Sequence, residues 1–264
     1  MHYQNVEDLI TKLIEEHPGY HDLISQVTQL VITFPPPFVF VNDPTTPRIT
    51  SNILRSILDA CSQISQDATN IRFAHVNAVA CFTTRIFYDT VLNALARWKA
   101  KWEDGCENYP GDGSGHRWND SVDGLVRGLR TIYAKMSEAD PEATRKIDLK
   151  GKGKQTNSSI DDPLVGNSRM VLVIERAEKL KETLPDLLVP LTRLAELVSL
   201  FSSLPAPYLI RQFWFPQTRI PITVIFVSEV QWQDVKPSLG ASPTPYLIDI
   251  PSPPKQGNFS PNAV

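Results

Sequence analysis

Five short segments rich in apolar residues constrain this chain more than any other feature, and three of them, FVFV, MVLVI and ITVIFV, are almost continuously apolar. A short continuous apolar run predicts a strand that is buried on both faces, as in a parallel sheet covered by helices. Segments with helical periodicity separate the runs, which favours an α/β fold over an antiparallel sandwich. The predicted strands are Phe38 to Val41, Ile71 to Asn77, Met170 to Ile174, Ile222 to Val227 and Tyr246 to Ile250.

The segments between these runs repeat apolar residues at helical spacing. Two short amphipathic helices precede the first strand, and Ser51 is a candidate cap for the helix that follows it. Pro190 is tolerated only in a first helical turn, so a helix running to Phe201 should begin near Asp186. The apolar faces lie within residues 9–14, 23–31, 53–61, 86–98, 118–129 and 187–201.

The length of 264 residues fits one large domain, which we place at residues 1–250. Polar residues dominate between Ser137 and Ser168, where the run KGKGKQTNSS predicts a disordered insertion at about 137–168. Residues 251–264 have no periodicity, and we expect an unstructured tail.

Composition argues against several classes of protein, namely strongly basic nucleic-acid binders, disulfide-rich or zinc-binding domains and membrane proteins. The 26 Lys and Arg residues against 29 Asp and Glu give a net charge of -3, so any contact with nucleic acid should be local. Cys61, Cys81 and Cys106 form no C-x-x-C pair, which argues against a disulfide framework or a zinc site, and the histidines also lack zinc spacing. Prolines 35–37 interrupt the longest apolar stretch, so we expect neither a signal peptide nor a membrane span.

The segment NDPTTPRIT follows the first predicted strand, where a nucleotide-binding protein would carry the phosphate loop G-x-x-x-x-G-K-[ST]. In that register Asp43 and Arg48 replace the glycines, Ile49 replaces the lysine, and only Thr50 is retained. Pro44 and Pro47 have no N–H to offer a phosphate. We therefore expect a degenerate ATP pocket, with no cofactor, although ATP and magnesium remain an alternative.

Polar residues also follow the third and fourth predicted strands. Glu175 could coordinate magnesium, but Arg176 stands where a second acid is expected. We favour salt bridges of these two residues at the strand end, because metal binding here needs the phosphates as co-ligands. Ser228 occupies the place of a γ-phosphate sensor and could instead cap a helix. The sequence predicts no catalytic residue, no metal ligand set and no enzyme activity, while residual ATPase activity stays open.

Three further features have both a functional and an ordinary interpretation. The glycines of GDGSGH lack the spacing of a phosphate loop, which favours a flexible loop. The basic residues between Arg145 and Lys154 could contact DNA or direct nuclear import, or form a solvated loop. Trp98, Trp102 and Trp118 could stack on bases, but the first lies on a helical stripe and is more typical of a core.

The strand-helix units resemble those of subunit 5 of the origin recognition complex, a family of AAA+ initiator proteins. The resemblance rests on the opening PGYHDLISQVTQL with the FVFV strand, and on HVNAVACFTTRIFYDTVLNAL, MVLVIERAEKLKETLPDLLVPLTRLAEL and ITVIFVSEVQWQDVKPSLG, and it covers roughly residues 18–250. It implies an AAA+ P-loop-type three-layer sandwich, in which a five-stranded parallel sheet is covered by helices on both faces.

The resemblance also implies a function in DNA replication initiation, through origin binding and helicase loading. The implied partners are the other subunits of a hetero-oligomer and, through the assembled complex, origin DNA in the nucleus, with no membrane contact. Family members commonly keep a recognisable phosphate loop and continue into a lid and a winged-helix domain, neither of which has a counterpart in this sequence. The chain could be a fragment, the product of a faulty gene model or a shortened protein.

Lys236, which precedes Pro237, matches a basic residue of the family that reaches the nucleotide of a neighbouring subunit. A solvated surface lysine is the other interpretation. We expect a scaffold subunit with a degenerate nucleotide site, and the alternative is an ATP-binding or ATP-hydrolysing AAA+ regulatory subunit.

Overall fold

The protein is described by a computed structural model, which covers residues 2–33, 36–64, 70–103, 105–111, 118–138, 168–200, 220–237 and 242–250. The predicted insertion at 137–168 lies outside these residues, except that Ser137 and Glu138 end a helix and Ser168 precedes a strand. The predicted tail, 251–264, also lies outside them. None of the described helices is long and apolar enough to cross a membrane.

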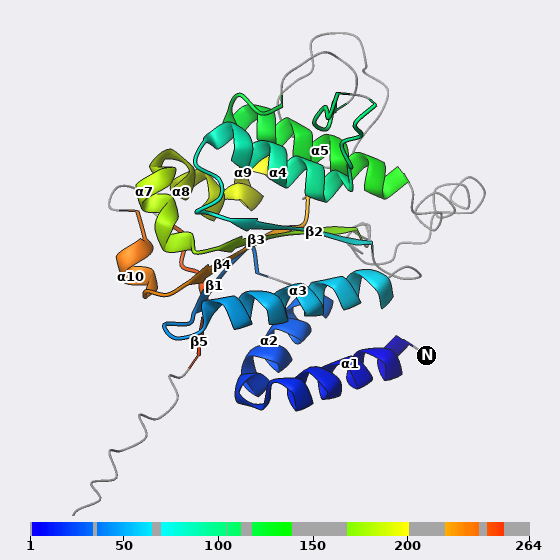
Figure 1. Ribbon diagram of the computed structural model, residues 1–264, viewed down its shortest axis with the longest axis vertical. Coiled ribbons are helices and arrows are strands. Elements are labelled where there is room, and N and C mark those ends of the chain that lie inside the picture. The colour runs from blue at the N-terminus through cyan, green and yellow to red at the C-terminus, as the bar shows by residue number, and fades with distance from the viewer. Residues whose placement is uncertain are drawn as a thin grey trace, which may run out of the picture.

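A five-stranded parallel sheet forms the centre of the molecule (Figure 1). Its order is β2-β3-β4-β1-β5, and all four pairings between neighbours are parallel. The prediction of a parallel sheet with helices on both faces is confirmed. The strands are β1 (Phe38–Asn42), β2 (Ile71–Asn77), β3 (Arg169–Glu175), β4 (Ile222–Ser228) and β5 (Tyr246–Asp249).

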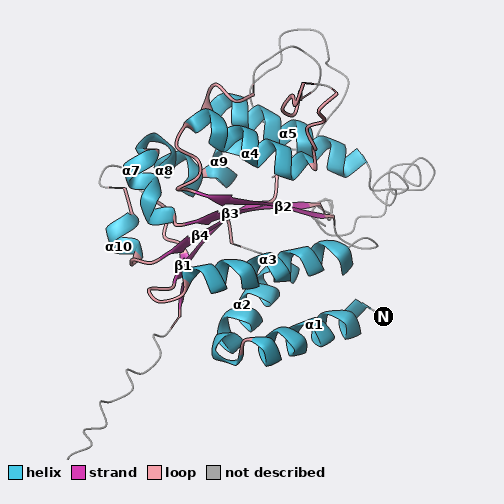
Figure 2. Cartoon of the chain, viewed as in Figure 1, coloured by secondary structure: helices cyan, strands magenta, loops and turns pink. Residues whose placement is uncertain are grey.

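Helices cover the two faces of the sheet as separate layers (Figure 2). One layer contains α1 (His2–Glu16), α2 (His21–Ile32) and α3 (Pro47–Ile64), with the short helix η1 (Pro18–Tyr20) joining the first two. The other contains α4 (Thr84–Ala96), α5 (Val122–Glu138), α8 (Pro185–Thr192) and α9 (Leu194–Leu200). Near the carboxyl ends of the strands lie η4 (Ala177–Lys179), α7 (Leu180–Thr183) and α10 (Trp232–Val235).

The runs of the central strands β1, β3 and β4 are almost continuously apolar because each of these strands contributes side chains to two cores. Val39, Val171 and Ile225 pack with α1, α2 and α3, whereas their sequence neighbours Phe40 and Leu172 pack with the other layer. Successive side chains of a strand point to opposite faces, so both faces are apolar when both are covered. The two edge strands depart from this pattern, because Arg72 and His75 interrupt β2 and only Ile248 is buried in β5.

Several local predictions are wrong in their details. Helix α3 begins at Pro47, so Ser51 lies buried inside the helix and does not cap it. Helix α4 ends at Ala96, so Trp98 is not part of its apolar stripe. Pro190 lies inside α8 rather than in its first turn, and the predicted long helix is two short helices with Arg193 between them. Trp118 is buried but lies before α5.

Candidate functional site at the carboxyl edge of the sheet

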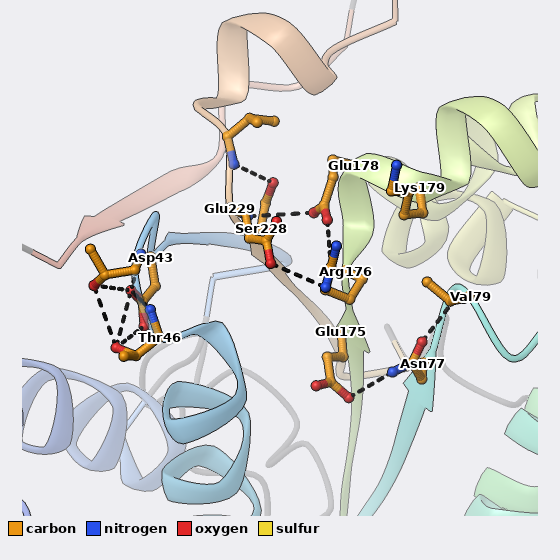
Figure 3. Close-up of polar contacts among 12 residues, drawn as sticks. Asp43, Thr46, Asn77, Val79, Glu175, Arg176, Glu178, Lys179, Ser228 and Glu229 are labelled. Carbon is orange, nitrogen blue, oxygen red and sulfur yellow. Dashed lines mark hydrogen bonds and ion pairs between the residues drawn. The ribbon is translucent and has the colours of Figure 1, made fainter.

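The carboxyl ends of the central strands bring most of the predicted site residues to one edge. The register pairs Asn42 with Ser228 and Glu175 with Val227, so the residues after β1, β3 and β4 are neighbours. In an open parallel sheet, ligands bind at this edge. Figure 3 shows a group of polar contacts around Asp43 and, apart from it, the contacts of Arg176 and those between Glu175 and Asn77.

The Asp43 carboxylate is fully buried and is surrounded by hydrogen-bond donors of its own loop. Oδ1 accepts hydrogen bonds from the backbone nitrogens of Thr45 and Thr46, at 3.1 and 2.9 Å. Oδ2 accepts a hydrogen bond of 2.6 Å from the Thr50 hydroxyl. Thr50 is the one residue of a phosphate loop that this sequence keeps, and its hydroxyl is turned to the protein's own anion.

The Asp43 cluster lies at the N-terminus of α3, where backbone N–H groups and the helix dipole favour a negative charge. Burial alone raises the pKa of Asp43, but the hydrogen bonds from Thr50, Thr46 and Thr45 outweigh it, and the pKa lies below its ordinary value. The carboxylate is therefore ionised at neutral pH. It occupies the donors that a phosphate loop directs at a phosphate.

The N-terminal helices also contribute to this cluster. The Tyr20 hydroxyl at the end of η1 shares a hydrogen bond with the Thr46 hydroxyl, which in turn lies 3.3 Å from Asp43 Oδ2. Sequence reasoning missed Tyr20, and nothing in its spacing could have indicated it, because the contact spans 26 residues. The hydroxyl groups of Thr45 and Thr46 were available as candidates from the motif itself.

Arg48 and Ile49 do not join the cluster. Both are exposed on the first turn of α3, and Ile49 retains 38% of its surface. The position that holds the phosphate-binding lysine in a P-loop is therefore an apolar side chain at the surface.

The second cluster joins the ends of β2, β3 and β4 (Figure 3). Glu175 accepts a hydrogen bond of 3.1 Å from Asn77 Nδ2. Arg176 adopts the left-handed conformation, with φ 59° and ψ 45°. Its Nε lies 2.8 Å from Glu178 Oε1 and its Nη1 lies 3.1 Å from Glu229 Oε1. The hydrogen bond to Glu178 and the nearby carboxylates keep the pKa of Arg176 above its ordinary value.

Arg176 therefore neutralises acids at the place where a P-loop enzyme would hold magnesium. Arg176 forms the predicted ion pairs, with Glu178 and Glu229, whereas Glu175 accepts a hydrogen bond from Asn77. Among the described residues no group of three His, Cys, Asp or Glu side chains could hold a metal ion.

Ser228 and Lys236 complete the predicted residues. Ser228 is fully buried, and its hydroxyl accepts a hydrogen bond of 3.2 Å from the backbone nitrogen of Val230. This closes a turn and does not cap a helix, because α10 begins after Gln231. Lys236 is exposed directly after α10, apart from the Asp43 and Arg176 clusters in sequence and in hydrogen bonding. The role assigned to it by the resemblance stays a prediction.

Comparison with known proteins gives matches among solved structures. No protein-family model matches the chain, and no curated protein matches it. Among solved structures, the chain matches one described as "Structure of Drosophila ORC bound to DNA", with a TM-score of 0.56. The match has 17% sequence identity and covers 92% of this chain and 46% of that chain. The chain therefore shares the fold of that structure, with its parallel sheet covered by helices on both faces, as expected for an AAA+ fold.

At this level of identity the likeness establishes the fold and not the biochemical function. The chain spans about half the length of the solved chain that it matches, with 46% of that chain covered. In open parallel α/β sheets ligands bind beyond the carboxyl ends of the strands, and the Asp43 and Arg176 clusters lie at that edge.

Proposed function

We propose that this protein is a scaffold subunit of an origin recognition complex, related to subunit 5, that acts in the nucleus in DNA replication initiation. The quoted sequence blocks and the likeness to a solved origin recognition complex support the family. The subunit would contribute its shape and its interfaces to the assembly, and would reach origin DNA through the assembled complex.

The buried Asp43 carboxylate is the main observation in favour of a degenerate nucleotide site. It accepts hydrogen bonds from two backbone N–H groups and from the Thr50 hydroxyl, and all three of these donors are uncharged. A triphosphate placed here would have to displace or oppose this carboxylate, without the lysine that normally balances phosphate charge. We infer that the subunit does not depend on an ATP of its own, and that ATPase activity belongs to other subunits.

A titration with a fluorescent ATP analogue in the presence of magnesium tests this inference. We expect no saturable binding at micromolar concentrations of the analogue. The alternative function, an ATP-binding regulatory subunit, requires magnesium-dependent binding that Glu175→Ala abolishes. Glu182→Ala is the matched control, because Glu182 is an exposed acid of the same region whose ion pair with Lys179 lies outside the strand ends.

Assembly is tested separately. The protein is co-expressed with the other subunits of the complex from the same source, and the products are separated by size-exclusion chromatography. We expect the protein to co-elute with the assembly in stoichiometric amount. An assembly that forms completely without it would contradict the proposal, whatever the outcome of the ATP titration.

Lys236 offers a further test within an assembled complex. A cation at this position can stabilise the γ-phosphate of a nucleotide bound by the neighbouring subunit. We expect Lys236→Ala to lower ATP affinity or hydrolysis at that neighbour. Gln233→Ala, an exposed change on α10, is the control, and equal activity in both variants would restrict the protein to its scaffold role.

A further inference from the structure

The segment that follows α4 carries an exposed set of cations and indoles. Residues 97–102 read RWKAKW, and all six are exposed. Arg97, Lys99 and Lys101 alternate along the run with the uncharged residues Trp98, Ala100 and Trp102. The Trp102 side chain retains 88% of its surface, the largest exposed fraction among the large apolar residues that the structure describes. A tryptophan this exposed contributes little to the core, so its place in the sequence needs another explanation.

Hydrogen bonds hold this segment in a defined conformation. Arg97 ends α4 in the left-handed conformation, and the Trp98 backbone nitrogen donates to Asn93 O at 2.8 Å. The Trp98 indole donates to the carbonyl of Glu107 at 2.9 Å. Gly105 N donates to Trp102 O at 3.1 Å, which closes a turn directly after the second indole. A ligand would meet a largely preformed loop, which lowers the entropy lost on binding.

The cations of the run have no carboxylate partner within ion-pair distance among the described residues. Arg72 of β2 adds a further positive charge beside Arg97, and its Nε is buried without a hydrogen-bond partner. Burial and the neighbouring Arg97 lower the pKa of Arg72. Three acids, Glu103, Asp104 and Glu107, follow the run in the sequence, and the described pair, Glu103 and Glu107, is exposed and forms no ion pair with it. The cations of the run are therefore accessible to the phosphates of a ligand.

A groove lies beside the run at the free edge of β2. It has a volume of about 390 Å³. It lies between the ends of α3 and α4, which cover opposite faces of the sheet (Figure 1). Polar groups and one aromatic ring line it, so it could accept a sugar or a base next to the cations. The lining residues are Asp59, Ser62, Gln63, Phe73, Ala94 and Arg97.

We propose that residues 97–102, together with Arg72, form a binding surface for single-stranded nucleic acid. Arg97, Lys99 and Lys101 contact consecutive phosphates, and the exposed indole of Trp102 stacks on an unpaired base. Alternating cations and exposed aromatic rings suit a single strand, because every base has a face to stack once it is freed from a duplex. A duplex would use the cations but could not use the indole.

This surface is separate from the carboxyl edge, and it does not depend on the assembly role proposed above. Arg97 to Trp102 follow a helix that begins near the carboxyl end of β2 and runs back along the sheet, so they lie at the opposite, amino edge. This placement agrees with the hydrogen bond from Arg72 Nη1, near the start of β2, to Leu95 O near the end of α4. Binding by the isolated chain can therefore be measured whether or not the chain enters a complex.

The test is fluorescence anisotropy of the full chain with labelled oligothymidine and oligouridine of about 20 nucleotides, and with a duplex of the same length. We expect saturable binding to the single strands that weakens with salt. Trp102→Ala should weaken it at least about fivefold, while Trp102→Phe retains most of it, because a phenyl ring can still stack. Lys99→Ala with Lys101→Ala should lower the slope of log affinity against log salt by about 1.4 in magnitude.

The matched control is Lys12→Ala with Arg193→Ala, which removes the same charge from two exposed ion pairs elsewhere. The control should bind like the wild type. Equal tightness for oligothymidine and oligouridine would mean that the surface does not distinguish DNA from RNA, as expected for stacking and phosphate contacts. Absence of saturable binding, equal losses in control and test variants, or duplex binding that ignores Trp102 would each overturn the proposal.

Discussion

The two polar clusters at the carboxyl edge neutralise charge in opposite ways. At the end of β1 the anion, Asp43, is fully buried and is held by uncharged donors of its own loop. At the ends of β3 and β4 the cation, Arg176, is partly exposed and is held by two carboxylates. Both places would carry phosphate or magnesium in an active P-loop protein, and here side chains of the chain occupy them.

The two clusters should contribute differently to the free energy of unfolding. Hydrogen bonds to a buried charge contribute about 1.5 to 3 kcal/mol each, whereas an exposed ion pair contributes about 0.2 to 1 kcal/mol. The Asp43 cluster is therefore coupled to folding, while the Arg176 cluster mainly fixes the geometry of the strand ends. Each of the following experiments perturbs one side of this comparison.

Asp43→Ala should have the largest effect. It leaves the Thr45 and Thr46 nitrogens and the Thr50 hydroxyl without their acceptor, so we expect a loss of about 3 kcal/mol. For a domain of this size the melting temperature should fall by about 6 to 12 °C. Asp249→Ala is the control, because that exposed carboxylate accepts one hydrogen bond from Asn42. Equal melting temperatures for the two variants would contradict a stabilising role of the buried anion.

Asp43→Asn should reveal the charge of the same group through its pH dependence. The folded pKa is below the ordinary value, so the unfolded chain takes up the proton first as the pH falls. The stability that the charge contributes is complete above about pH 4 and is lost as the pH falls through the folded pKa. Thermal melts should show a gap between wild type and variant at neutral pH that closes in acid. A gap that stays constant into strong acid would show that the charge is not responsible.

Two substitutions of Arg176 distinguish the contribution of its ion pairs to stability from the cost of its left-handed backbone conformation. Arg176→Ala and Arg176→Gly both remove the contacts to Glu178 and Glu229, but only glycine adopts a positive φ without cost. The glycine variant should therefore be the more stable of the two by about 1 kcal/mol, or about 2 to 4 °C in melting temperature. The opposite order would mean that the left-handed conformation is relaxed in the folded protein.

Rebuilding the phosphate loop should produce the smallest change of the four experiments, because we expect it to leave ATP binding weak. The triple change Asp43→Gly, Arg48→Gly and Ile49→Lys removes the internal anion and supplies the lysine. Pro44 and Pro47 still lack N–H groups, so we expect no tight ATP binding. Calorimetric titration of a variant shown to be folded by circular dichroism would measure this. Micromolar affinity would show that the prolines are compatible with a working loop.

Particular elements show how far the sequence could be interpreted without a structure. The central strands β1, β3 and β4 were predicted within one residue at each end, because a strand buried on both faces must be apolar throughout. The edge strand β2, which contains Arg72 and His75, was also predicted with its observed bounds. Local chemistry was less reliable. Ser51 has the residue type of a cap, but Pro47 starts the helix four residues earlier, which a proline can do because it needs no N–H donor at that position.

The candidate site also has features that could be predicted from the sequence and features that could not. The replacement of the phosphate-loop glycines and lysine could be predicted from the sequence, because that motif has a fixed spacing next to a strand. The direction of the Asp43 side chain could not be predicted, since it depends on how the loop folds back onto its own donors. Tyr20 and Asn77 were missed because their partners, Thr46 and Glu175, are distant in sequence and meet only when the elements pack.

The sequence by itself determined the α/β class, the strand positions and the loss of the phosphate-loop residues, because these follow from apolar periodicity and local spacing. Only the tertiary structure decided that Asp43 is a buried internal anion, that Arg176 connects two strand ends, and that Trp102 remains exposed beside cations that form no ion pair with any residue described by the structure. Hydrogen bonding and burial depend on which distant segments come together, and no local pattern of residues encodes that.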